Sequence, residues 1–175
     1  MRNFDINAYI RDDPKSNTFE MHRDVFRDPG LFEMEMRSIF EGGWVFVCLE
    51  SQLPKPFDFH CTRIGRRPVM VTRDGEGGLH CFHNTCRHRG ATLRQSECGN
   101  SQFHVCDYHG WAYDSKGQNI DIKDQEVAHY PESFKSKDHD LLPVARFAAY
   151  RDLLFASLSP DVLPLEEYLG DARVF

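Results

Sequence analysis

Two short loops that each pair a cysteine with a histidine constrain this chain more than any other feature of its sequence. The first reads Cys86-Arg-His88 and the second reads Cys106-Asp-Tyr-His109, with 17 residues between them. A glycine follows each loop closely, Gly90 in the first case and Gly110 in the second. Because two tight loops facing each other across a hairpin can present four ligands to one centre, this spacing predicts a metal site.

The mixture of ligand types within each loop discriminates between two kinds of metal site. Zinc accepts two cysteines and two histidines, but its usual pattern places the cysteines in one loop and the histidines in another. A Rieske [2Fe–2S] cluster has two cysteines on one iron and two histidines on the other. The sequence therefore favours the cluster, with Cys86, His88, Cys106 and His109 as its ligands. A structural zinc module remains the alternative.

The other cysteines are not expected to bind metal. Cys48, Cys61 and Cys81 lie in apolar or alternating stretches, where a buried free thiol is the ordinary state. Cys98 lies in a predicted turn between the loops and is expected to be a bystander, since the loops already supply four ligands. His104, next to Val105, is expected to be an ordinary strand residue.

Composition narrows the class of protein. The chain has 175 residues, of which 41% are hydrophobic, so it can form a core. Its net charge of −6 and the lack of a basic run argue against nucleic acid as a partner. No apolar run is long enough to cross a membrane, and the start lacks the apolar segment of a secretory signal. These features predict a cytoplasmic protein that binds neither nucleic acid nor membrane.

The hydrophobic pattern predicts a mainly β fold of small antiparallel sheets, preceded by a helix and followed by the start of another. The first helix is expected over residues 28–43, with Asp28 as its N-cap and Pro29 in its first turn. Strand patterns follow at 44–49, 57–64, 68–73, 79–84, 102–105 and 111–113, with two more within 144–158. Residues 1–20 are expected to be an extended arm, 123–141 a surface excursion and 164–170 the start of a helix. The predicted divisions are 1–43 for the arm and helix, 44–160 for the metal-binding domain and 161–175 for a linker or helix.

The stretches NTCRHRGATL and HVCDYHGWAYDSKG resemble the N-terminal Rieske domain of the large (alpha) subunits of aromatic-ring-hydroxylating dioxygenases. The similarity covers about residues 20 to 172. The flanking stretches 21–54 and 144–170 are similar to the subgroup that acts on benzoate, anthranilate, salicylate and related aromatic acids. The resemblance implies a Rieske fold and a role in aromatic dihydroxylation and catabolism.

The resemblance also implies partners. In this family, electrons pass from an NADH-dependent reductase or a ferredoxin to the cluster, and then to a mononuclear non-haem iron that activates dioxygen. That iron belongs to a catalytic domain of the same or a neighbouring large subunit, and a small beta subunit accompanies some members. The chain is therefore expected to relay electrons, with a free-standing Rieske ferredoxin as the alternative.

A mononuclear iron site needs two histidines and one carboxylate. The candidates beyond the second loop are His129 and His139, with Glu126, Asp138 and Asp140 nearby, and their spacing does not suit such a triad. We therefore expect the non-haem Fe(II) to lie in a catalytic domain absent from this sequence. The chain alone is not expected to hydroxylate a substrate.

Three positions distinguish this sequence from respiratory Rieske proteins. Those proteins staple their ligand loops with a disulfide, but the matching positions here are Ala91 and Tyr108. Trp111 replaces a serine that donates toward the cluster, so a reduction potential near the low end of the Rieske range, about −150 mV, is expected. Tyr113 is either another donor to the cluster or a tyrosine packed in a strand.

Overall fold

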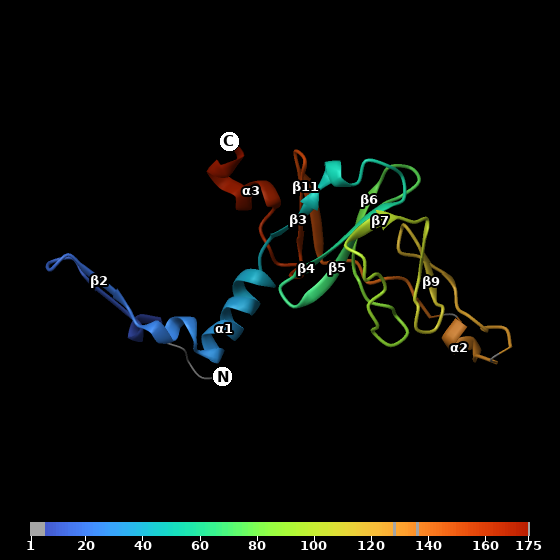
Figure 1. Ribbon diagram of the computed structural model, residues 1–175, viewed down its shortest axis with the longest axis horizontal. Coiled ribbons are helices and arrows are strands. Elements are labelled where there is room, and N and C mark those ends of the chain that lie inside the picture. The colour runs from blue at the N-terminus through green and yellow to red at the C-terminus, as the bar shows by residue number, and fades with distance from the viewer. Residues whose placement is uncertain (1–5, 128, 136, 175) are drawn as a thin grey trace.

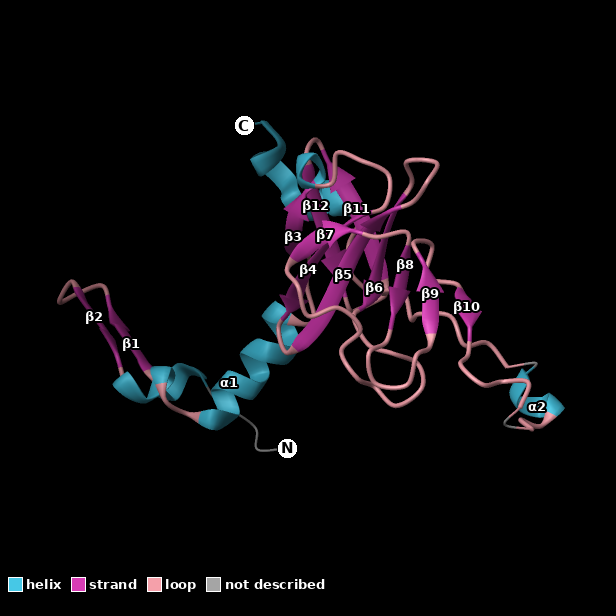
Figure 2. Cartoon of the chain, turned by 45° about the vertical axis from the view of Figure 1, so that its right-hand side comes forward, coloured by secondary structure: helices cyan, strands magenta, loops and turns pink. Residues whose placement is uncertain are grey.

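The computed structural model of the chain describes residues 6–127, 129–135 and 137–174. Its body is built from antiparallel sheets, from which an N-terminal arm projects (Figures 1 and 2). The largest sheet has the order β6-β5-β4-β7, formed by Leu79–His83, Arg67–Arg73, Asp58–Ile64 and Cys98–Asn100. A second sheet has the order β11-β12-β3, formed by Arg146–Tyr150, Leu153–Ser157 and Val45–Leu49. A third has the order β10-β9-β8, formed by Asn119–Asp121, Ala112–Asp114 and Phe103–Val105.

The central strand β5 shows how the sequence divides the core. Val69, Met70 and Val71 are all fully buried, and successive side chains of a strand point to opposite faces. Val69 and Val71 belong to an apolar cluster shared with β3 and β12. Met70 belongs to a second cluster that includes both cysteines of the Cys/His loops, Cys86 and Cys106. The Cys/His loops are thus anchored in their own half of the core.

The helix predicted for residues 28–43 is present but shorter. Asp28 is its N-cap, because its carboxylate accepts bonds from the backbone N–H groups of Gly30 and Leu31. Helix α1 spans Pro29–Glu35 and continues as a turn of π-helix, η3, over Met36–Phe40. Its apolar face is only partly covered: Leu31 and Met36 are buried, whereas Phe32, Ile39 and Phe40 are exposed.

The arm is more structured than the sequence predicted. After a 3-10 turn, η1, at Ile6–Ala8, residues expected to be extended form the hairpin of β1 (Ile10–Asp13) and β2 (Thr18–Met21). A 3-10 turn, η2, at Arg23–Phe26 joins the hairpin to α1. The sequence did not predict the hairpin, because it buries no side chain and so lacks an alternating apolar pattern; residues 1–5 of the predicted arm lie outside the described residues.

The predicted strands of the body are confirmed to within one or two residues, apart from two that were missed. Strand β7 occupies the stretch around Cys98 that was expected to be a turn, and β10 follows the third sheet's hairpin. The two strands predicted within 144–158 are β11 and β12, and a 3-10 turn, η4, follows β3 at Glu50–Gln52. The 123–141 excursion contains the short helix α2 (Glu132–Lys135), and the predicted C-terminal helix is α3 (Leu165–Leu169), followed by a 3-10 segment, η5, at Gly170–Val174. Within the described residues, no helix is long and apolar enough to cross a membrane.

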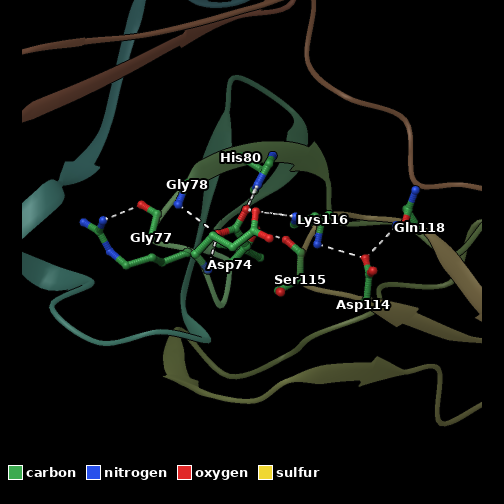
Figure 3. Close-up of polar contacts among 11 residues, drawn as sticks. Asp74, Gly77, Gly78, His80, Asp114, Ser115, Lys116 and Gln118 are labelled. Carbon is green, nitrogen blue, oxygen red and sulfur yellow. Dashed lines mark hydrogen bonds and ion pairs between the residues drawn. The ribbon is translucent and has the colours of Figure 1, made fainter.

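Two hairpin turns of the same construction lie at the ends of β6 and β9 that are remote from the Cys/His loops. In each, the leading aspartate accepts bonds from the backbone N–H groups two and four residues ahead, at 2.8 Å for Asp74 and 2.9 Å for Asp114 (Figure 3). Each turn has a glycine with positive φ, +93° at Gly77 and +81° at Gly117, a conformation that glycine adopts without strain. Similar local sequences thus build similar turns in two different sheets.

The two turns contact each other and join the sheets. The Thr72 hydroxyl donates to the carbonyl of Ser115 at 2.7 Å. The Lys116 ammonium donates to Glu76 at 2.8 Å and lies 4.0 Å from the Asp74 carboxylate (Figure 3). These contacts fix the far ends of the hairpins that carry the Cys/His loops.

Candidate metal centre

Each Cys/His loop closes on its own backbone in the same way. In the first loop, the N–H of Cys86 donates to the carbonyl of Ala91, and the N–H of Gly90 donates back to Cys86. In the second, Cys106 bonds to Trp111 and Gly110 bonds back to Cys106 with the same residue offsets. These four bonds are 2.8 to 2.9 Å long. The glycines have φ of +76° and +72°, which explains why a glycine follows each loop.

The structure brings the four predicted ligands together as two pairs, one residue of each pair coming from each loop. The Cys86 and Cys106 side chains are buried next to each other in the same apolar cluster. The imidazole rings of His88 and His109 lie beside each other, with centroids 4.6 Å apart and planes at 80°. Two thiols therefore lie together and two imidazoles lie together, which is the pairing that a [2Fe–2S] cluster with mixed ligands uses.

The electrostatics of these groups fit a metal. Burial raises the pKa of the Cys86 thiol; bonds from Tyr113 and from the His88 backbone oppose this shift, and the Cys106 thiol adds to it. A bound cation would reverse that shift, since coordinated thiols are deprotonated. Burial, followed by His109 and Arg89, lowers the pKa of His88 and keeps its ring neutral, as a ligand requires.

Two buried nitrogens of the first loop, Arg87 Nε and His88 Nδ1, have no hydrogen-bond partner among the described residues, and of the two only the imidazole nitrogen can bind a metal. His88 Nδ1 has no partner among the residues that the structure describes, although it is shielded from solvent. A buried polar atom without a partner is rare in folded proteins, and a lone pair of this kind is suited to a metal. The donor set and this orphaned atom together fit a Rieske cluster held between the loops.

Tyr113 connects the strand after the second loop to the first loop. Its side chain is fully buried, and its hydroxyl lies 3.4 Å from the Cys86 sulfur. The same oxygen accepts a bond from the Arg87 backbone N–H at 3.0 Å. With Cys86 as a thiolate, the tyrosine hydroxyl is the donor. Of the two roles left open by the sequence, the geometry fits a donor that is also packed in a strand.

Trp111 lies against the face of His88. The two rings are almost parallel, with planes at 13° and centroids 5.0 Å apart. Trp111 also contacts the 123–141 excursion edge-on, with ring centroids 5.1 Å from His139 and 6.1 Å from Phe134. The indole therefore fixes the orientation of the His88 ring and screens it from water.

The remaining cysteines lie away from the loops' tips. Cys48 and Cys81 are buried as predicted, and burial raises the pKa of Cys48 to about 12, so both are inert thiols. Cys61 is half-buried rather than buried, and burial raises its pKa to about 11. Cys98 is exposed, on the edge strand β7.

Two features escaped the sequence analysis. His104 was expected to be an ordinary strand residue, but it is fully buried and accepts a bond from Arg94. Asp74 is buried and accepts a bond from His80 at 2.8 Å. Asp74 and His80 lie six residues apart on one hairpin and Arg94 and His104 lie ten residues apart, so neither contact appears in the periodicity of a single strand. The one signal in the sequence was the histidine within an apolar strand pattern.

Candidates for a mononuclear iron site do not converge. Within residues 6–127, 129–135 and 137–174, no three His, Cys, Asp or Glu side chains form a group that could hold one metal ion. His139 instead packs on Trp111 and bonds to the carbonyl of Phe134. A two-iron cluster does not need such a group, because each iron takes only two protein ligands.

Comparison with known proteins also indicates a Rieske domain. Residues 43–131 match the Rieske [2Fe–2S] domain. The chain is 44% identical over 169 residues to the alpha subunit of toluate 1,2-dioxygenase from Pseudomonas putida, covering 96% of this chain and 37% of that protein. It is 41% identical to the large subunit of anthranilate 1,2-dioxygenase from Acinetobacter baylyi, covering 93% and 34% of the two chains.

The fold is similar to that of solved oxygenases. The naphthalene 1,2-dioxygenase of Rhodococcus sp. superposes with a TM-score of 0.75 at 34% identity, over 85% of this chain and 34% of that one. The chain thus spans about a third of the length of these relatives. With its loop geometry, its paired thiols and imidazoles and the match over residues 43–131, the chain belongs to the family of Rieske [2Fe–2S] domains.

Proposed function

We propose that this chain relays electrons for an aromatic-ring-hydroxylating dioxygenase. Cys86 and Cys106 would hold one iron of the cluster, and His88 and His109 would hold the other. The observation that carries this proposal is the pairing of the four side chains at the tips of two loops with the same backbone construction. The orphaned Nδ1 of His88 supports it independently.

When bound, a Rieske cluster supplies a one-electron centre whose potential depends on its ligands and on hydrogen bonds to its sulfurs. The chain's own groups would set that environment. Tyr113 donates to Cys86 and so favours the thiolate, and Trp111 keeps the His88 ring in place. His88 and His109 are both half-buried and so less enclosed than the two cysteines, which makes the histidine side of the site the proposed side for electron transfer to a partner.

The partners follow from the relatives and are part of the proposal. An NADH-dependent reductase or a ferredoxin would supply electrons, and a mononuclear iron outside the matched region would receive them. Toluate, 2-halobenzoate and anthranilate appear in the names of similar proteins, so an aromatic acid is the proposed substrate class. We also propose that the assembly has several subunits and resides in the cytoplasm. The divisions 1–43, 44–160 and 161–175 remain our domain assignment.

The test is metal analysis of protein purified without oxygen, with visible absorption and low-temperature EPR before and after dithionite. We expect about two irons and two acid-labile sulfides per chain, and a rhombic signal only after reduction. A colourless protein with one zinc would refute the proposal and favour the structural module. If the cluster is reduced by NADH through a reductase but passes electrons only to soluble acceptors, the chain is a free-standing ferredoxin.

The ligand assignment is tested separately by Cys86→Ser and His109→Ala. Each should abolish the rhombic signal, because each removes a ligand from a different iron. Cys98→Ser is the matched control, since Cys98 is exposed on β7. Retention of the wild-type signal in either ligand variant would overturn the assignment.

A further inference from the structure

A single arginine joins the bases of the two Cys/His loops. Arg94 closely follows the first loop, and its guanidinium reaches strand β8, which leads into the second. It donates to His104 Nδ1 at 3.0 Å, to the Ser101 hydroxyl at 2.8 Å and to the Phe103 carbonyl at 2.6 Å. His104 lies only two residues before Cys106. The arginine therefore spans from the end of one loop to the start of the other.

The backbone of Arg94 is fixed as well as its side chain. The Asn84 side chain donates to the Arg94 carbonyl at 2.7 Å and accepts from the Arg94 N–H at 2.9 Å. A bridge between Thr85 and Thr92 lies just inside this pair. These contacts close the neck of the first loop, so a movement of Arg94 would move the whole loop.

The acceptor on the other side is equally rigid. His104 is fully buried, and its ring contacts that of Phe59 edge-on at 5.4 Å. The Arg94 guanidinium lies 5.3 Å from the centre of the same Phe59 ring. Because Arg94 donates to Nδ1, the proton of the neutral ring is on Nε2, which has no partner among the described residues. The arginine thus selects one tautomer and one orientation of a buried ring.

The other contacts between the loops are made at the cluster site itself, where the Tyr113 hydroxyl reaches Cys86 and Trp111 stacks on His88. A groove of about 700 Å³ opens beside it, lined by residues of both loops, including Thr92, Asp107 and Tyr108. Side chains that border a groove do not pack against one another across it. The fork of Arg94, in the wall of that groove, adds a polar contact between the segment that leaves the first loop and the strand that leads into the second.

We propose that Arg94 is a positioning residue that sets the separation of the two Cys/His loops and thereby the geometry of the cluster site. The proposal rests on the proposed function only for its cluster readouts. Lysine cannot replace it, because one ammonium does not reach three acceptors with the planar fork of a guanidinium.

The experiment compares Arg94→Met and Arg94→Lys with the matched control Arg73→Met. Arg73 also makes three side-chain bonds, to Leu53, Gly77 and Glu50, but it lies on β5 away from the loops. In Arg94→Met we expect the half-life of the cluster absorbance under a chelator to fall roughly tenfold, with altered EPR g values. Arg94→Lys should change the g values in the same direction although it keeps the charge. Arg73→Met should lower thermal stability and leave both cluster readouts at wild type.

A second readout does not need the cluster. In iron-free protein with Cys98→Ser, a mild oxidant should join the adjacent Cys86 and Cys106 thiols as a disulfide, and Arg94→Met should slow this reaction severalfold. Equal rates and equal spectra in the Arg94 and Arg73 variants would overturn the positioning role. If wild type holds no iron, the proposed function fails, and the oxidation rates alone decide the role of Arg94. If Arg94→Met does not fold, Ser101→Ala, which removes one acceptor, should give a smaller change of the same sign.

Discussion

The molecule contains two hairpin units that run in opposite order along the chain. The first begins with the aspartate turn 74–78, continues through β6 and ends in the Cys/His loop 86–91. The second begins with the Cys/His loop 106–111, continues through β9 and ends in the aspartate turn 114–118. Reversal of the order places both loops at one end of the fold and both turns at the other. Identical local hydrogen bonds recur in each pair.

The units differ in what supports them from outside. The first loop is held by Asn84, by Arg94 and by the Tyr113 hydroxyl, which all come from beyond its own turn. The first turn contains a buried aspartate with a histidine partner, whereas Asp114 is half-buried. Short-range sequence therefore builds the loop, and long-range contacts decide where it sits.

The largest expected effect is on iron content, and it should be the same for both units. Cys86→Ser and Cys106→Ser should each reduce the iron content to near zero, because both would remove a thiolate from the same iron. Iron analysis of the anaerobically purified proteins is the measurement. Cys98→Ser should keep the full content. A stable half-loaded protein from one loop variant and none from the other would show that the loops are not equivalent.

The two aspartate turns should differ in how much each stabilises the fold. Asp74→Asn should lower the free energy of unfolding by roughly 2 kcal/mol, since it weakens charged bonds to His80 and to two backbone N–H groups. Asp114→Asn should cost less, because Asp114 is more exposed. Urea denaturation at pH 7 measures both. Equal losses of unfolding free energy in the two variants would mean that the greater burial of Asp74 adds no stability.

Acid should act through the same turn. The bond from His80 is the main cause that lowers the pKa of Asp74 to about 2, against an ordinary value of 3.8. Its unfolded form therefore takes up a proton first, so the stability it contributes is complete above about pH 4 and is lost as the pH falls toward 2. Urea titrations across this range should show a steeper fall for wild type than for Asp74→Asn. Parallel curves would assign the acid response to other groups.

The loop glycines should behave alike. Gly90→Ala and Gly110→Ala each place a side chain at positive φ, and each should cost about 1.5 kcal/mol. A new Cβ at position 90 meets no atom within 4 Å, and at position 110 the three nearest atoms all belong to the Lys123 side chain. Thermal melts of the two variants should coincide within about 1 kcal/mol. A much larger loss at position 110 would reveal packing that the first loop lacks.

The smallest expected effect is on the reduction potential of the cluster. Tyr113→Phe removes one donor of about 1 kcal/mol to Cys86, which corresponds to a fall of about 40 mV in the midpoint of a one-electron couple. Redox titration followed by EPR measures it. Tyr108→Phe on the second loop is the control, because that ring is 67% exposed. An unchanged midpoint in Tyr113→Phe would make this tyrosine purely a packing residue.

Most of the fold follows from local patterns. The short apolar stretch within 68–73 predicted strand β5, and Asp28 with Pro29 predicted the start of the helix. The spacing of the cysteines and histidines was enough to predict the four candidate ligands. Hydrogen bonds that join distant segments could not be read from the sequence. Asp74 and His80 have the pattern of a turn residue and a strand residue, and nothing in the local sequence indicates that Lys116 of the second turn lies beside Asp74. Strand β7 was missed because its residues are exposed and carry no apolar alternation.

The self-closing bonds of the loops have a consequence for how metal and fold depend on each other. A zinc finger is disordered without its ion, so the metal must order the chain as it binds. Here each loop completes a ring of its own peptide groups, rooted in a core of large apolar side chains. The entropy of shaping the site is thus lost when the polypeptide folds and not when iron arrives. Cluster assembly therefore requires little further ordering of the chain, and the two loops should keep their shape when the cluster is removed.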